Sequence, residues 1–365
     1  MTLTAITMPK WGLSMEEGIV QDWHVAEGEN IAAGDELVDV ETSKIANAVE
    51  AAADGTLLRQ VAKSGATHRI GDLLAVVGPA GTNAAEIDAF VGGFEREEPD
   101  ADDEAAGAET KTATANGIAI AYDEAGDGDG VPLLFLHGVS GDRQNWMFNR
   151  DALSKDRRTV AIDLPGHGES AKDAGDGGID TLADTVAAVM AGIDLPPAIV
   201  VGHSLGGGIA IAIAGRHPDR VAGLALLSSI GTGGALDRGF IDDFLAADRR
   251  GAMKSVLKRL FADDSLVTRD MVADMLAYRR LDGVTEALDR IALGALSEDS
   301  AGKLTERRAA LTQPVLILHG AEDEVIAPPA SGATLIEGAA HMPHMEAAAA
   351  CNEAIRNFVA EHDDD

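Results

Sequence analysis

Residues 1–80 of the 365-residue chain contain an internal repeat, which restricts the folds that this segment can adopt. When the chain is shifted against itself, strand and turn residues of the two copies coincide: Gly18 with Gly55, Gly28 with Gly65, Gly34 with Gly71, Asp35 with Asp72, Leu37 with Leu74 and Val40 with Val77. Each copy consists of short strand-like runs separated by turn glycines, which is typical of a small all-β sandwich. Residues 17–77 therefore predict two copies of one unit.

Lys44 lies at the junction of the two copies, in Glu41-Thr42-Ser43-Lys44, where a hairpin would place one amine at its tip. A pseudo-twofold sandwich with a lysine in the hairpin between its halves resembles the lipoyl/biotinyl carrier domain over residues 3–79. Biotin-accepting relatives usually carry methionine on both sides of the lysine, whereas Ser43 and Ile45 flank Lys44. The resemblance therefore implies lipoate, bound covalently to Lys44. The alternative is a solvated turn lysine on a domain that is kept for structure.

The resemblance implies a lipoyl-carrier domain over residues 1–80, and the change in composition after it predicts an acidic flexible linker over residues 81–113, followed by a second domain over residues 114–365. The linker contains few apolar residues and many charges. A net charge of -32 disfavours nucleic acids and anionic lipid surfaces as partners. The chain has no apolar run long enough to cross a bilayer, no secretory signal and a single cysteine, Cys351, so we expect a cytoplasmic protein. No metal site is predicted.

The second domain contains regularly spaced apolar runs of the kind found in strands that are buried on both faces. These runs are 133–136, 159–162, 198–201, 224–227 and 315–318. They predict a mostly parallel sheet flanked by helices. The third run ends in Gly202-His203-Ser204-Leu205-Gly206 and is followed by helix-forming residues, the strand-turn-helix context in which G-x-S-x-G forms a nucleophile elbow.

The remaining members of a catalytic triad follow in the order that is typical of the α/β-hydrolase family, which this domain resembles. Asp323 follows an apolar strand and is the predicted acid, with Glu322 and Glu324 as weaker candidates. His341 is the predicted base, and His344 is the competing histidine. The resemblance further implies an oxyanion hole formed by the backbone N–H groups of Val139 and Leu205. Amphipathic segments over about residues 231–310 predict a helical cap above the site.

A lipoyl carrier joined to an α/β-hydrolase domain resembles the acyltransferase (E2) components of bacterial acetoin dehydrogenase complexes over nearly the whole chain. The resemblance implies transfer of an acetyl group from the Lys44 arm to coenzyme A by Ser204, Asp323 and His341. The partners that it implies are a thiamine-diphosphate E1 component, a flavin E3 dehydrogenase, a lipoate-attachment enzyme and further copies of this chain in a homo-oligomer.

Two alternatives stay open at this point. The first alternative to the acyltransferase is a serine esterase or thioesterase that carries a lipoyl domain for docking. The second is a lipoyl carrier whose hydrolase-like domain serves only for assembly. Most lipoyl-linked acyltransferases use an H-x-x-x-D-G signature, which this chain lacks. Whether coenzyme A or water is the final acyl acceptor is not decided by the residues, because exclusion of water has no sequence signature.

Overall fold

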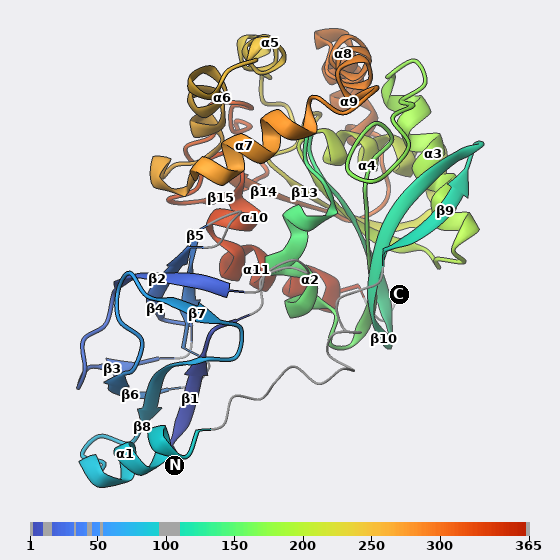
Figure 1. The fold of residues 1–365 in the computed structure, drawn as a ribbon. Helices are drawn as coiled ribbons and strands as arrows, with labels where there is room; N and C mark the ends of the chain where they lie inside the picture. The colour runs from blue at the N-terminus through green and yellow to red at the C-terminus, as the bar shows by residue number, and fades with distance from the viewer. Residues whose placement is uncertain are drawn as a thin grey trace. The chain divides into compact units, whose positions relative to one another are not determined.

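The structure is a computed structural model that describes residues 3–9, 17–32, 34–41, 46–51, 54–94 and 110–362. The chain forms two compact units, of which the first contains a β sandwich and the second contains a large sheet with its helices (Figure 1). Among the described residues, no helix has both the length and the apolar character needed to cross a membrane.

The first unit is a sandwich of two four-stranded antiparallel sheets, which confirms the predicted all-β class. One sheet has the order β1-β8-β6-β3 and the other β5-β4-β2-β7. The strands are β1 (Thr4–Thr7), β2 (Glu17–Trp23), β3 (Asn30–Ile31), β4 (Glu36–Glu41), β5 (Ala46–Glu50), β6 (Gly55–Gln60), β7 (Thr67–Arg69) and β8 (Leu73–Gly78). Apolar residues from both copies of the repeat, among them Leu37 and Leu74, are fully buried between the sheets.

Equivalent glycines of the repeat take up equivalent turn conformations. Gly28 and Gly65 have φ of 94° and 80°, and Gly34 and Gly71 have φ of 92° and 80°. These left-handed values favour glycine, so the repeat conserves the turns as well as the strands. Strands β4 and β5 pair with Glu41 opposite Ala46. The connecting residues 42–45, including Lys44, lie outside the described part of the chain.

Helix α1 (Ala84–Gly92) follows the sandwich, inside the segment predicted as a linker. The Asn83 side chain caps it by accepting a hydrogen bond from the Ala85 N–H, and Ile87 is buried. Strand β9 begins at Lys111, slightly before the predicted start of the second domain. The domain boundaries themselves stay predictions.

The second unit is built on a seven-stranded sheet with the order β11-β10-β12-β13-β14-β15, in which β9 also pairs with β10. The strands are β9 (Lys111–Ala115), β10 (Ile118–Leu136), β11 (Arg157–Ile162), β12 (Ala198–His203), β13 (Val221–Leu227), β14 (Val315–Gly320) and β15 (Thr334–Ile336). The neighbours of β12 and β13 run parallel to them, and the last residues of these strands meet at one edge of the sheet. The five predicted apolar runs all lie within these strands.

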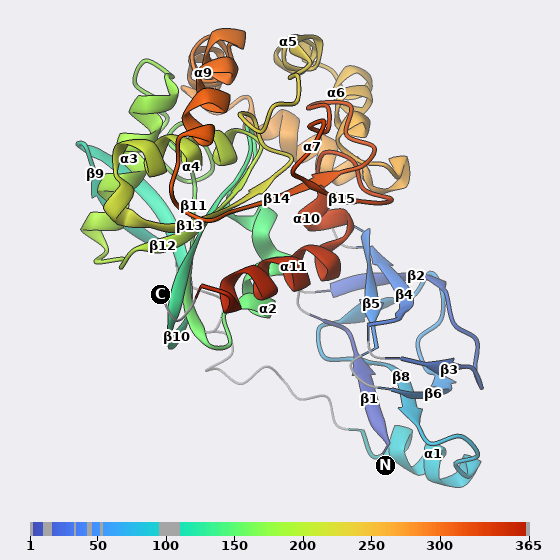
Figure 2. The same ribbon diagram turned by 180° about the vertical axis from the view of Figure 1, so that it is seen from behind.

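Helices cover both faces of this sheet (Figures 1 and 2). Helices α3 (Ile179–Gly192) and α4 (Leu205–Arg216) lie on one face, and α2 (Met147–Leu153) and α11 (Ala348–Ala360) lie on the other. Alternate strand residues such as Phe135 and Val201 pack with Cys351 and Ile355 of α11 in one buried cluster. This arrangement is the predicted α/β-hydrolase architecture.

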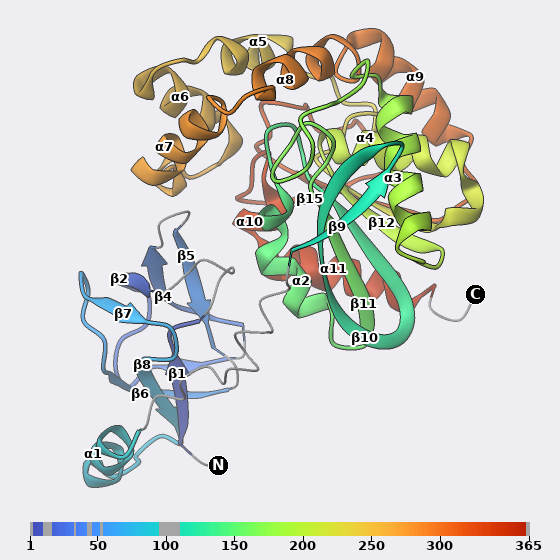
Figure 3. The same ribbon diagram turned by 45° about the vertical axis from the view of Figure 1, so that its right-hand side comes forward.

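Five helices and two short 3₁₀ turns separate β13 from β14. They are α5 (Arg238–Ala246), α6 (Arg250–Leu257), η3 (Lys258–Leu260), η4 (Asp264–Leu266), α7 (Arg269–Tyr278), α8 (Val284–Leu293) and α9 (Glu298–Ala309). Figure 3 shows α5 to α8 grouped together at one end of this unit. They correspond to the predicted helical cap.

Candidate active site

Ser204 occupies a sharp turn between β12 and α4. Its φ of 52° and ψ of −114° lie in a region that residues other than glycine rarely adopt. The flanking glycines permit this turn, because a Cβ atom on Gly206 would lie 2.2 Å from the Leu136 carbonyl oxygen and one on Gly202 would lie 2.6 Å from the Gly206 carbonyl oxygen. The structure thus places the Ser204 hydroxyl at the start of a helix, as in a nucleophile elbow.

Asp323 and His341 form a buried hydrogen-bonded pair. His341 Nδ1 lies 2.9 Å from Asp323 Oδ2. The other carboxylate oxygen, Oδ1, accepts hydrogen bonds from the backbone N–H groups of Val325 (2.8 Å) and Ile326 (3.0 Å). With Asp323 as acceptor, Nδ1 of His341 carries the proton, and Nε2 is left as the basic nitrogen.

His319 is a further partner of Asp323 that the sequence did not single out. It is fully buried on β14, its Nε2 donates to the Ile326 carbonyl oxygen at 2.8 Å, and the same nitrogen lies 3.2 Å from Asp323 Oδ2. Burial opposes ionisation of Asp323, but His341, His319 and the backbone donors outweigh it and hold the pKa of Asp323 well below its usual range. Asp323 is therefore a carboxylate at neutral pH. The only sequence signal for His319 is its position at the end of a buried strand.

His341 is held by its main chain as well as its ring. Its N–H donates to the Leu260 carbonyl oxygen at 3.0 Å, and its carbonyl oxygen accepts from His203 Nε2 at 2.8 Å. The structure pairs Asp323 with His341 rather than with His344, and neither Glu322 nor Glu324 forms a side-chain hydrogen bond with His341 in residues 110–362.

His344 instead belongs to a buried ring stack. Its ring lies 4.5 Å from Trp146 and 4.6 Å from His203, centroid to centroid, and is fully inaccessible to solvent. Within the described part of the chain, neither of its ring nitrogens has a hydrogen-bond partner. Burial, with a smaller effect of His341, lowers the pKa of His344 to about 3, so the ring is neutral.

Val139 and Leu205, whose N–H groups are the predicted oxyanion donors, belong to the loop after β10 and to the start of α4. Val139 lines the same cavity as Ser204 and follows Gly138, where a Cβ atom would lie 3.1 Å from the Ser204 Cβ. Leu205 is the first residue of α4, so its N–H has no carbonyl partner within the helix. Glycine at position 138 thus lets the loop after β10 approach the serine.

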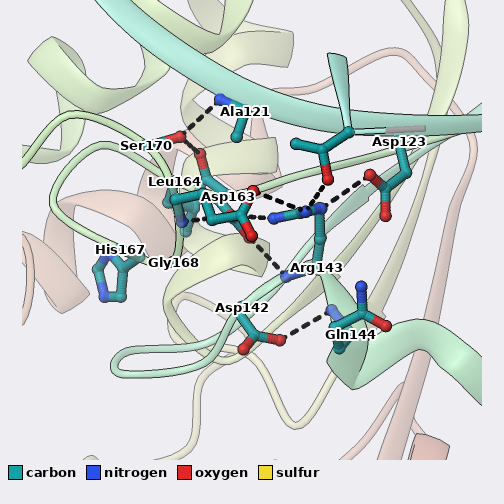
Figure 4. A network of polar contacts seen from close by, with 12 residues as sticks. Ala121, Asp123, Asp142, Arg143, Gln144, Asp163, Leu164, His167, Gly168 and Ser170 are labelled. Atoms are coloured by element: carbon teal, nitrogen blue, oxygen red, sulfur yellow. Dashed lines mark hydrogen bonds and ion pairs between the residues drawn. The ribbon is translucent and has the colours of Figure 1, made fainter. Parts of the chain in front are cut away.

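A buried ionic network fixes this loop (Figure 4). Arg143, in η1 (Arg143–Trp146), contacts Asp163 through Nη1 (2.5 Å) and Asp123 through Nε (2.9 Å), while its backbone N–H donates to Asp163 Oδ1 (2.8 Å). Glu169 N donates to Asp163 Oδ2 at 2.7 Å. Asp163 therefore holds the loop in place through Arg143.

Ser204 and His341 open into one cavity of about 80 Å³. Half of its other lining residues are apolar residues of the cap, including Phe240, Phe244, Leu260 and Met275. Within residues 110–362 no hydrogen bond joins the Ser204 hydroxyl to His341. Such bonds often shorten only when substrate is bound. The arrangement can perform acyl transfer through a serine nucleophile in an apolar chamber.

Two family models match the chain. Residues 4–77 match the model described as biotin-requiring enzyme, and residues 131–347 match the model of the alpha/beta hydrolase fold. A solved serine hydrolase from Cycloclasticus zankles has a TM-score of 0.63 over 70% of this chain and 99% of its own, at 20% identity, which shows the fold alone.

Two curated relatives extend over both units. The chain is 43% identical to the dihydrolipoyllysine-residue acetyltransferase component of the acetoin cleaving system of Pseudomonas putida, over 98% of each chain. It is 41% identical to the protein of the same name from Cupriavidus necator, again over 98% of each chain. The two-domain arrangement is thus shared along the full length of these relatives.

Proposed function

Because the chain belongs to the family of dihydrolipoyllysine-residue acetyltransferase components of acetoin cleaving systems, we propose that it moves an acetyl group from a lipoyl arm on Lys44 to coenzyme A. The enzyme class follows from the family and agrees with the prediction from sequence. The proposal assigns the chemistry to Ser204, Asp323 and His341, with Val139 and Leu205 as oxyanion donors. The observation that carries it is the buried Asp323–His341 pair, whose histidine lines the same cavity as Ser204.

The sandwich fits lipoate on Lys44. Strands β4 and β5 pair antiparallel with Glu41 opposite Ala46, and Lys44 falls between them in the sequence. Lipoate, once bound as an amide to the lysine, supplies a thiol that carries the acyl group. The four-carbon stem and nucleophilic amine of lysine suit this attachment.

In the proposed acylation step, His341 Nε2 takes the proton of Ser204, and Ser204 Oγ attacks the carbonyl carbon of the acetyl thioester. The Val139 and Leu205 N–H groups stabilise the oxyanion. The carbon–sulfur bond then breaks, and His341 returns its proton to the leaving thiolate. Asp323 keeps His341 in the required tautomer and stabilises the imidazolium that forms between these two proton transfers.

Deacylation reverses these roles. His341 takes the proton of the coenzyme A thiol, whose sulfur attacks the acetyl-serine carbonyl; the ester bond to Ser204 breaks and the hydroxyl regains the proton. Attack by water instead would release acetate. The apolar cap residues around Ser204 support transfer to coenzyme A over hydrolysis, because they reduce access of water to the acetyl-serine.

The family places the chain in a system with further components. As partners we propose a thiamine-diphosphate E1 component, a flavin E3 dehydrogenase and a lipoate-attachment enzyme, together with assembly into a homo-oligomer. The single cysteine, Cys351, is free and buried, which agrees with the proposed cytoplasmic location.

The test compares wild type with Ser204→Ala, using acetyl-dihydrolipoamide as donor and coenzyme A as acceptor. We expect the substitution to reduce formation of acetyl coenzyme A by at least about 10³-fold, because the nucleophile is lost. Full transfer by the Ser204→Ala variant would contradict the serine mechanism. Release of acetate by wild type with coenzyme A present would favour the esterase alternative.

A further inference from the structure

The Glu346 side chain joins the cap to the loop that carries His341. Glu346 is the last residue of α10 (Pro343–Glu346), and its carboxylate points back along the chain. Oε1 accepts a hydrogen bond from the Ala262 N–H at 2.6 Å, and Oε2 accepts one from the Ala340 N–H at 2.9 Å. One carboxylate thus bonds the segment that follows η3 and the residue that directly precedes the catalytic histidine.

A second hydrogen bond joins the same two segments. The His341 N–H donates to the Leu260 carbonyl oxygen at 3.0 Å, two residues before Ala262. The side chain of Leu260 also lines the cavity around Ser204. Residues 260–262 are therefore attached to residues 340–341 at two points, and the same segment contributes an apolar wall of the active site.

The two attachments differ in what they require. The bond from His341 to Leu260 involves main chain only and is independent of side-chain identity. The bond to Ala262 exists only through the Glu346 carboxylate, which accepts charge-assisted hydrogen bonds from both segments at once. No other side chain in residues 110–362 bonds both segments.

We infer that Glu346 is a positioning residue that holds the cap segment 260–262 against the His341 loop and thereby couples closure of the cap to placement of the catalytic base. This inference rests on the proposed function. Loss of the carboxylate would displace the His341 loop, which slows acylation, and would loosen the cavity wall at Leu260, which admits water to the acetyl-serine. The share of acetyl groups that ends as acetate should then rise.

The experiment uses the full-length lipoylated protein and changes the attachment from each side. Glu346→Gln replaces the carboxylate with an amide, which has a single accepting oxygen and so can keep only one of the two hydrogen bonds. Ala262→Pro removes the donor on the cap side, and Phe261 already has the extended conformation (φ −123°, ψ 142°) that a residue before proline adopts. Glu353→Gln is the matched control, because Glu353 is exposed on α11 and is outside the cavity lining.

Two reactions are followed for each variant. The first is transfer from acetyl-dihydrolipoamide to coenzyme A, with acetyl coenzyme A and acetate measured together. The second is hydrolysis of p-nitrophenyl acetate, which requires the serine machinery but neither lipoate nor coenzyme A. Circular dichroism verifies that each variant is folded, and the Ala262→Pro variant keeps the inference testable if Glu346→Gln does not fold.

We expect Glu346→Gln and Ala262→Pro each to lower kcat/KM for the ester about fivefold or more and to raise the ratio of acetate to acetyl coenzyme A about fivefold. The double variant should resemble the single ones, because both remove the same attachment. The Glu353→Gln control should stay within about twofold of wild type in both reactions.

The inference is overturned if the variants hydrolyse the ester and partition acetyl groups as wild type does, or if the two substitutions have fully additive effects. It is also overturned if rates fall while the partition is unchanged, since Glu346 would then support the histidine without controlling the cap. A wild-type protein that yields acetate alone contradicts the proposed function. In that case the rates of p-nitrophenyl acetate hydrolysis alone test whether Glu346 couples the cap segment to the His341 loop.

Discussion

His344 provides a quantitative test of the buried ring stack beside the active site. Its ring is fully inaccessible and neutral, with a pKa lowered from 6.5 to about 3 by burial. The unfolded chain therefore binds more protons at His344 than the folded chain does between about pH 3 and pH 6.5. Stability consequently falls as the pH is lowered through this window, and His344→Phe should remove this contribution.

The magnitude follows from the linkage relation. With a pKa of 6.5 in the unfolded chain and about 3 in the folded chain, His344 lowers the free energy of unfolding by about 2 kcal/mol when the pH changes from 7 to 5. The His344→Phe variant should lose about 2 kcal/mol less than wild type over this interval. Its stability at pH 7 is a separate quantity, because the larger phenyl ring must be fitted into the stack.

Urea unfolding at pH 7 and pH 5, followed by circular dichroism at 222 nm, measures this difference. Helices α2 to α6 and α8 to α11 all belong to the second unit, so the signal reports mainly on the unit that contains His344. The control is Trp146→Phe, which disturbs the same stack without removing a titratable group and should shift both free energies equally. If His344→Phe lost as much stability between pH 7 and pH 5 as wild type, the neutral buried state of His344 would be refuted.

Two further predictions concern the groups that hold the site. Asp323→Asn should reduce the rate of acetyl transfer by roughly 10³–10⁴-fold with little change in KM, because His341 would lose the partner that fixes its tautomer; steady-state kinetics measure this, and a loss below tenfold would contradict it. Arg143→Met should lower the free energy of unfolding by about 3–5 kcal/mol in urea, since Asp163 and Asp123 are fully buried and would lose their main cationic partner. Unchanged stability would show that these carboxylates are neutral or satisfied in another way.

Local patterns in the sequence predicted the elements that carry the candidate site. The apolar run before Ser204 and the glycines on both sides of it specify strand, turn and helix, because only glycine avoids the clashes found at Gly202 and Gly206. The repeat likewise specified the sandwich, since Gly28 and Gly65 need the same left-handed turn. The turn conformations are local, although the clash avoided at Gly206 is with Leu136, which is distant in sequence.

Contacts between distant segments were not predictable in the same way. His341 and His344 lie on one short stretch, and only the fold directs the first toward Asp323 and the second into the stack with Trp146. His319 and Glu346 have no motif, because each acts through a neighbour that the tertiary structure brings to it. The order of the strands in the sheet is a further property that the apolar runs left undetermined.

The central claim is that the acetyl group passes through Ser204, and trapping that intermediate tests it most directly. Wild-type protein is mixed with acetyl-dihydrolipoamide in the absence of coenzyme A, quenched in acid within milliseconds, digested and analysed by mass spectrometry. The account predicts an acetyl group on the peptide that contains Ser204 and its disappearance when coenzyme A is added before the quench. An unmodified Ser204 peptide at every time point, while acetyl coenzyme A still forms at the normal rate, would contradict it.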